Sequence, residues 1–165
     1  MSLAPQAPKP RIEDALPTAL SPEKAALALD FVTFLRQWRM SPQWASANSW
    51  AVSCKGKRVC YIKITSSGAW YIRPAVQYDE TLRAFCQQEG LTGIMLNCVH
   101  HCTGCGKCAP GKTAVFFGQT LEHVCCSPID FEFHDPDDLT LDCAKKIILY
   151  RRNAIMAASK NSKGR

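Results

Sequence analysis

Residues 98–126 concentrate metal-binding side chains more densely than any other part of this 165-residue chain. The segment reads CVHHCTGCGKCAPGKTAVFFGQTLEHVCC and holds six of the ten cysteines and three of the four histidines. Cys102, Cys105 and Cys108 are spaced as CxxCxxC, and the glycines around them interrupt any regular helix or strand. The pattern therefore predicts a tight loop folded about a metal ion.

A closed zinc site is the first interpretation of this loop. Structural zinc takes four thiolate or imidazole ligands in a tetrahedron, and a CxxC turn is long enough to place two sulfurs on one ion. We expect Cys102, Cys105 and Cys108 to bind the ion. Cys125 would supply the fourth ligand from a second loop. Because no position is left for water or substrate, such a zinc is structural, and its binding energy would hold residues 98–112 against the segment near residue 125.

An iron–sulfur cluster is the alternative. CTGCGKC resembles the cluster-binding motif of bacterial ferredoxins, in which a fourth cysteine follows three residues later and precedes a proline. Here Lys112 stands at that fourth position, and the two-cluster repeat of those ferredoxins is absent from the rest of the sequence. A single cluster would take Cys125, Cys126 or Cys98 as its remaining ligand. Cys126, Cys98 and the nearby histidines are equally open as substitutes in the zinc site.

A radical-enzyme interpretation is weaker. Cys98, Cys102 and Cys105 spell CxxxCxxC, which is similar to the motif of radical S-adenosylmethionine enzymes. That family places the motif after the first strand of a much longer α/β barrel, and a full barrel of this kind needs roughly 250 residues. Too little chain follows Cys105 for that fold, so we interpret the spacing as a coincidence within a cysteine-dense stretch.

Composition places the chain among ordinary globular domains. It is 47% hydrophobic and 21% charged, which is enough apolar material for one core. No apolar run reaches the roughly 18–20 residues that cross a bilayer, and the start of the chain lacks the apolar stretch of a signal peptide. We therefore expect a soluble, cytoplasmic protein without a membrane partner, in which thiols stay reduced and clustered cysteines bind metal or carry redox chemistry.

The net charge of +6 is unevenly distributed. Residues 145–165 carry basic groups and no acidic one, whereas acidic residues gather over 130–142. Acids favour the start of a helix and bases its end, so the helix dipole explains most of this pattern. The basic residues support a tail that contacts nucleic acid only weakly, and a solvated helix end is the better interpretation.

The order of elements predicts an α+β fold. Residues 1–20 are rich in proline, which removes a backbone donor and fixes one torsion, so we expect a flexible arm there. Ser21 and Pro22 predict the start of a helix that ends near Met40. Residues 48–74 contain three apolar and aromatic runs separated by KGKR and TSSG, which predicts a three-strand antiparallel meander.

The second half of the chain continues this pattern. A second helix is expected between Asp79 and Gly90, and a third begins at Asp135. LTGIMLN and IDFEF supply one or two further strands. Strands and helices that do not alternate regularly favour an antiparallel sheet packed with about three helices. We place a single α+β domain at residues 21–155 and a loose basic tail at 156–165.

Two groups of side chains on these elements have different expected roles. Four cysteines lie beside apolar neighbours and are expected to be buried and structural: Cys54, Cys60, Cys86 and Cys143. One face of the meander carries aromatic and cationic residues, namely Tyr61, Lys63, Tyr71 and Arg73. Such a face is able to stack a planar ligand or a base, although the wet side of a sheet is the commoner explanation.

Several motifs together resemble a family of small, uncharacterised bacterial proteins. They are CxxCxxCAPG followed by FGxxxxxVC, the preceding NSWAVSCKGKRVCYIKI and GAWYIRP, and the paired arginines of the closing helix. The resemblance covers roughly residues 25–155 and brings no established activity. It implies Cys102, Cys105, Cys108 and Cys125 as the ligand set.

Catalytic motifs are absent from the sequence. It contains no GxSxG turn, phosphate-binding glycine loop or HExxH helix, so we assign no catalytic residue and favour a role other than that of an enzyme. We expect a zinc-binding domain that acts as a binding or regulatory module for an unknown small molecule or protein. The alternative is an iron–sulfur or thiol-based redox or electron-transfer protein. Nothing in the sequence sets the oligomeric state.

Overall fold

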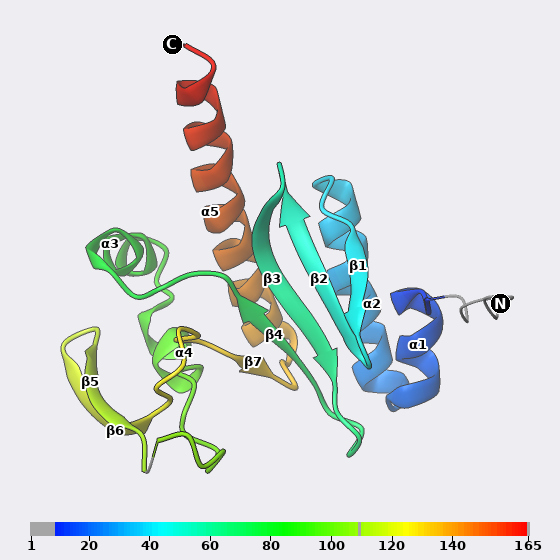
Figure 1. Ribbon diagram of the computed structural model, residues 1–165, viewed down its shortest axis with the longest axis horizontal. Helices are drawn as coiled ribbons and strands as arrows, with labels where there is room; N and C mark the ends of the chain where they lie inside the picture. The colour runs from blue at the N-terminus through cyan, green and yellow to red at the C-terminus, as the bar shows by residue number, and fades with distance from the viewer. Residues whose placement is uncertain (1–8, 109, 165) are drawn as a thin grey trace, which may run out of the picture.

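A five-stranded antiparallel sheet, in the order β1-β2-β3-β4-β7, is the frame of the fold (Figure 1). The computed structural model describes residues 9–108 and 110–164. Its strands are β1 (Pro42–Ser46), β2 (Ser49–Cys54), β3 (Lys57–Ile64), β4 (Trp70–Pro74), β5 (Lys112–Phe116), β6 (Gln119–Val124) and β7 (Phe133–His134). Its helices are α1 (Ile12–Ala19), α2 (Pro22–Gln37), α3 (Glu80–Gln88), α4 (Thr92–Asn97) and α5 (Asp138–Ser162). The α+β class is confirmed.

The predicted meander forms β2, β3 and β4. Lys55 and Gly56 both have positive φ, at 50° and 73°, which is the backbone of the two-residue turn that joins β2 to β3. Alternate side chains, such as Trp50, Ile62 and Ile72, are buried on one face. Helices α2 and α5 cover that face (Figure 1), as the periodicity of 2 in the strands requires.

Helix α5 is longer than expected and begins later. Its N-cap is Asp137, whose Oδ1 accepts a hydrogen bond from the Thr140 amide at 2.8 Å. The predicted start at Asp135 is wrong by a few residues because the Asp135 carboxylate bonds to other parts of the fold instead of capping the helix. The helix continues to Ser162, so residues 156–162 are helical and the predicted loose tail is wrong there; buried Ile155 holds this last part against the core.

The expected N-terminal arm is also wrong over residues 12–19, which form α1. Ile12 and Leu16 recur at helical spacing and are buried, and the carboxylate of Glu13 pairs with Arg36 of α2. Apolar packing against α2 therefore outweighs the effect of the nearby prolines. Residues 1–8, which belong to the same predicted arm, lie outside the described residues.

Three further elements differ from the sequence-based expectation. LTGIMLN forms α4 rather than a strand, because a short apolar run fits a buried helical turn as well as a strand, and Met95 is buried there. Only Phe133–His134 of the IDFEF region pairs with β4, while Phe131 bridges to Val99. Strand β1, at Pro42–Ser46, extends the meander at its other edge. None of the helices in the described ranges is long and apolar enough to span a membrane.

Asp135 fastens three parts of the fold together. Its backbone has a φ of 42°, and its carboxylate accepts hydrogen bonds from the Trp70 amide at 3.0 Å and from Lys24 Nζ at 2.9 Å. Burial acts to raise the pKa of Asp135, but the bonds from Lys24 and the Trp70 amide, together with the charge of Lys24, leave that pKa below its ordinary value. The ionised carboxylate therefore stabilises the contact between α2, β4 and the segment before α5.

We expect Asp135→Asn to lower the free energy of unfolding at pH 7 by about 1–2 kcal/mol, because the ionic part of both hydrogen bonds is lost. Asparagine tolerates positive φ as well as aspartate does, so the change isolates the charge. The stabilisation is complete above the ordinary carboxyl pKa of about 3.9 and is lost as pH falls through the lower folded-state pKa. Urea unfolding at pH 7, 5, 4 and 3 should show the variant and the wild type converging at low pH.

Asp142→Asn is the matched control, since Asp142 is an exposed carboxylate on α5. Its substitution should change stability little at any of these pH values. A constant difference between Asp135→Asn and the wild type from pH 7 to pH 3 would contradict the assignment.

Candidate metal centre

The second half of the cysteine-rich region forms a β-hairpin that packs on the core. Strands β5 and β6 are joined by Phe117 and Gly118, with φ of 52° and 76°, in a two-residue turn. Phe116 is buried with its ring centroid 5.7 Å from that of Phe131, and the Phe117 amide donates to the Tyr78 hydroxyl at 2.7 Å. The hairpin was expected only as a loop, although the X-Gly pair between TAVF and QTLEHV is a hairpin signal.

The segment before CxxCxxC pairs along the end of β6. His101 and Val124 form an antiparallel bridge. On either side of it, the Cys102 amide donates to the His123 carbonyl at 2.7 Å and the Cys125 amide donates to the His100 carbonyl at 2.9 Å. Two of the predicted ligands, Cys102 and Cys125, therefore flank one backbone bridge although they are distant in sequence.

Gly111 brings a third segment into this junction. A Cβ at this position would lie 2.7 Å from the Val124 carbonyl oxygen and 3.0 Å from the Cys102 Cβ, and its φ is 95°. No other residue type fits this backbone and this space without a shift. Close approach at Gly111 thus draws the end of the CxxCxxC loop against both strands that carry Cys102 and Cys125.

The predicted ligands are only partly gathered. A hollow of about 360 Å³ is lined by Cys102, Gly104, Gly106, Cys108, Pro110 and His123. Cys105 is exposed and is not among the described residues that line it. Cys125 is half-buried beside exposed Cys126, and the side chain of Cys126 lies close enough to that of Cys108 for Cys108 to raise its pKa. Across residues 9–108 and 110–164, no three Cys, His, Asp or Glu side chains stand close enough together to hold a metal ion.

Both cysteines at the bridge accept amide hydrogen bonds at sulfur. The Gly104 amide lies 3.5 Å from Cys102 Sγ, and the Ser127 amide lies 3.5 Å from Cys125 Sγ. In each case the donor is two residues after the cysteine, as in a turn wrapped around a thiolate. At Cys125 this bond helps to lower the pKa and so favours the ionised sulfur that a metal needs. Such bonds also orient the ligand, which is the role of groups behind a metal ligand.

The pKa values of the neighbouring cysteines Cys125 and Cys126 are shifted in opposite directions. The Ser127 hydroxyl, then the Ser127 amide and the charges of Arg73 and Lys112, lower the pKa of Cys125 against the opposing effect of burial. Its hydrogen bond with Cys108, more than burial, raises the pKa of Cys126 to about 11. The surroundings of Cys125 therefore favour its thiolate, and those of Cys126 favour its thiol.

The buried cysteines behave as expected. Cys54, Cys60, Cys86 and Cys143 are all buried, and burial raises the pKa of Cys86 to about 11 and that of Cys143 to about 12. Cys98 joins them: it is 7% exposed, and burial raises its pKa to about 11. A core thiol of this kind is a poor metal ligand. Cys98 is thus removed from the possible substitutes.

The histidines of this region, like its cysteines, include both buried and exposed side chains. Burial is the main cause that lowers the pKa of His100, whose Nε2 lies 3.6 Å from Glu132 Oε2. His123 is exposed on the hairpin, with Nδ1 3.1 Å from the Pro110 carbonyl oxygen. A carbonyl only accepts, so Nδ1 carries the proton and Nε2 is the nitrogen with a free lone pair. His123 is therefore the histidine best suited to replace a cysteine ligand.

No family model, curated protein or solved structure matches this chain. The resemblance to small bacterial proteins stays a prediction, and the function is argued from the residues themselves. The proximity of Cys126 to Cys108 is a feature that the sequence does not indicate. It arises from the way two irregular loops meet, for which spacing in the sequence carries no signal.

We expect Gly111→Ala to open the junction between the CxxCxxC loop and the hairpin. The substitution combines an unfavourable positive φ, about 1–2 kcal/mol for a residue with a Cβ, with a clash against the Val124 carbonyl. Amide hydrogen exchange measures the result directly: the Cys102 and Cys125 amides should lose protection in this variant.

Gly118→Ala is the matched control. Gly118 has a similar φ of 76°, but nothing lies within 4 Å of a Cβ at this position. It should therefore show the cost of strain alone, with the Cys102 and Cys125 amides still protected. Equal loss of protection in the two variants would mean that the close approach at Gly111 does not hold the junction.

Proposed function

We propose that this chain is a zinc-binding domain in which the metal clasps the cysteine-rich hairpin to the rest of the fold, and that the domain acts as a binding module. The observation that carries the proposal is the backbone bridge between His101 and Val124, because Cys102 and Cys125 directly follow the two bridged residues, one on each side of the bridge. Two further observations support the proposal. A backbone amide donates a hydrogen bond to the sulfur of each of these cysteines, and the space at Gly111 admits no side chain.

The donor set fits zinc. Four cysteines in two short loops supply the thiolates of a closed tetrahedral site, as proposed from the spacing: Cys102, Cys105, Cys108 and Cys125. Cys105 has to turn inward, and the positive φ of Gly104 and Gly106 gives the loop the backbone freedom for this change. When bound, zinc supplies a structural cross-link, and its affinity adds to the stability of the folded hairpin.

The clasp matters for binding because the segment that begins at Cys125 runs on to two hollows. Cys125 is four residues before Ile129, which lines both of these adjoining hollows on the open side of the sheet. Glu132, a little further on, forms an ion pair with Arg73 of β4 at 2.7 Å. A metal that fixes Cys125 therefore also fixes the segment that forms one wall of these hollows.

A thiol-based redox or iron–sulfur protein is the second candidate. The contact between Cys108 and Cys126 favours it, because two neighbouring thiols outside the core are suited to reversible pairing. An iron–sulfur cluster would use the same loop cysteines. Metal analysis separates these candidates from zinc.

Protein purified without oxygen should be colourless and contain about one zinc per chain by elemental analysis. Cys105→Ser should lose most of this zinc and unfold at a lower temperature, because a three-ligand site binds more weakly. Cys126→Ser is its matched partner, an exposed cysteine in the same region, and should keep the metal.

Brown protein that contains iron and labile sulfide would overturn the zinc proposal in favour of the cluster. Metal-free protein with a Cys108–Cys126 disulfide after mild oxidation would favour the thiol-based role. If Cys126→Ser loses zinc and Cys105→Ser keeps it, zinc binding stands and Cys126 replaces Cys105 as the fourth ligand.

A further inference from the structure

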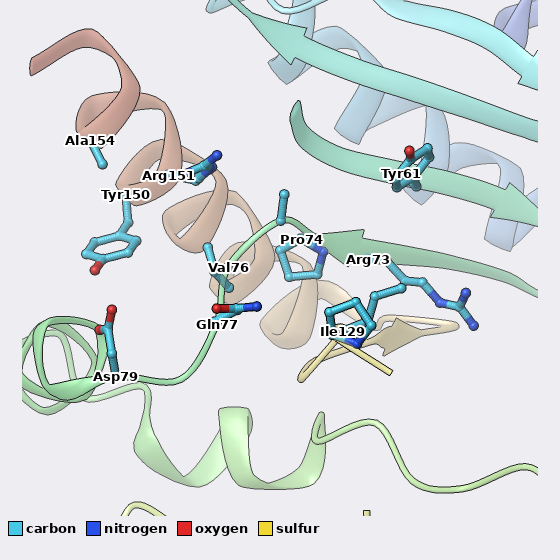
Figure 2. A pocket seen from close by; sticks show the side chains of 12 residues that line it. Tyr61, Arg73, Pro74, Val76, Gln77, Asp79, Ile129, Tyr150, Arg151 and Ala154 are labelled. Atoms are coloured by element: carbon cyan, nitrogen blue, oxygen red, sulfur yellow. The ribbon is translucent and has the colours of Figure 1, made fainter. Parts of the chain in front are cut away.

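A long groove crosses the face of the sheet opposite α2. It consists of a hollow of about 540 Å³ and a neighbouring one of about 220 Å³, which share Tyr61, Arg73 and Ile129. Figure 2 shows the larger hollow: Tyr150 and Arg151 of α5 stand at one side, Tyr61 and Arg73 of the sheet at the other, with the segment after β4 between them. The smaller hollow continues the groove along the sheet.

Positive charge follows the groove along its length. Lys63 lines the smaller hollow and Arg151 the larger one, while the Arg58 guanidinium lies over the Tyr61 ring. These three cations take part in none of the ion pairs among the described residues. Each hollow therefore has one cation without an ion-pair partner among the described residues, and a third such cation lies beside the shared Tyr61. Arg151 Nε also donates to the Arg58 carbonyl at 3.2 Å.

Two acidic groups lie in or near the groove. Asp79 lines the larger hollow and caps α3, where its Oδ1 accepts from the Leu82 amide at 2.8 Å, but it keeps its charge because it forms none of the ion pairs among the described residues. Glu132 is ion-paired with Arg73, which also stacks on the Tyr71 ring at 4.6 Å. Lys63, Arg58 and Arg151 outnumber Asp79, so the net charge of the groove is positive and the groove is complementary to an anion.

Tyr61 supplies the apolar part of the site. Tyr61 is 38% exposed, and few other large apolar residues in the described ranges are as exposed. It lies in the part common to both hollows, with Arg58 over its ring. Exposed aromatic rings next to cations bind nucleic-acid bases by stacking and the adjacent phosphates by charge.

We propose that this groove binds single-stranded nucleic acid, with a base stacked on Tyr61 and the phosphates along Arg58, Lys63 and Arg151. A chain-like polyanion fits better than a single nucleotide because the groove extends through both hollows and carries a cation in each hollow. A duplex hides its base faces and leaves Tyr61 unused. The inference names the ligand of the proposed binding module and rests on that proposed function, since the metal clasp steadies the wall at Ile129.

Fluorescence anisotropy of a labelled 12-nucleotide oligo(dT) and oligo(U) with the full chain tests the proposal. Tyr61→Ala should weaken binding about 5- to 100-fold, the loss of one stacked base. Tyr61→Phe keeps the ring and should restore most of the affinity. Arg151→Gln should weaken binding at low salt and reduce the slope of log affinity against log salt by about 0.7, the value for one phosphate contact on a single strand.

Lys160→Gln is the charge control, because Lys160 is exposed near the end of α5 and lines neither hollow. It should leave the affinity unchanged. Three results would overturn the proposed groove. The first is equal affinity for a 12-base-pair duplex, and the second is full displacement of the oligonucleotide by thymidine monophosphate at the same total concentration of nucleotides. The third is a loss of affinity in Lys160→Gln as large as that in Arg151→Gln.

Zinc content, measured on the same samples, keeps the two proposals apart. Protein that holds zinc and binds no oligonucleotide overturns the groove and leaves the zinc domain standing. Protein that binds the oligonucleotide with the expected loss in Tyr61→Ala, but holds no zinc, overturns the metal clasp and supports the groove.

Discussion

The backbone of residues 98–102 is the connection on which the rest of the site depends. Along one edge it meets the segment before β7: the His100 amide donates to the Asp130 carbonyl and the Glu132 amide to the Cys98 carbonyl, both at 2.8 Å. Along the other edge it meets the end of β6 through Cys102 and Cys125. Buried Cys98 and Val99 hold this strip in the core, so the hairpin is attached to the core through main-chain hydrogen bonds.

How much of the fold could be predicted from the sequence depends on whether each element is determined by neighbouring residues or by residues far away in the chain. Alternation within β2, β3 and β4 is local, and it predicted the meander and its buried face. The helical fate of residues 12–19 depends on packing against α2, and that of α4 on burial of Met95, so neither follows from local propensity. Asp135 looks like a helix cap in sequence but is recruited by Trp70 and Lys24, which are far away in the chain.

The same reasoning applies to the candidate metal centre. Spacing predicts metal-binding chemistry for the CxxCxxC loop, because ligand type and turn length are local properties. Which cysteines complete a site depends on how the two loops meet in space. Cys98 has the right chemistry but faces the core, whereas Cys126 looks redundant in sequence and contacts Cys108.

The segment from Cys125 to Glu132 joins the two proposed sites mechanically. It begins at the thiol with the lowered pKa, passes Ile129 in the groove wall and ends at the carboxylate that pairs with Arg73. Its hydrogen bond to the His100 backbone and the ion pair with Arg73 hold both ends of the segment. Next to Ile129, Asp130 accepts from the His100 amide at 2.8 Å and from the Tyr78 amide at 2.7 Å, so the middle of the segment is held as well. A ligand bound in the groove would gain affinity from a wall that is already ordered, because less conformational entropy is lost on binding. The proposed metal clasp would therefore order the proposed groove from a distance, without any metal ligand in contact with a bound strand.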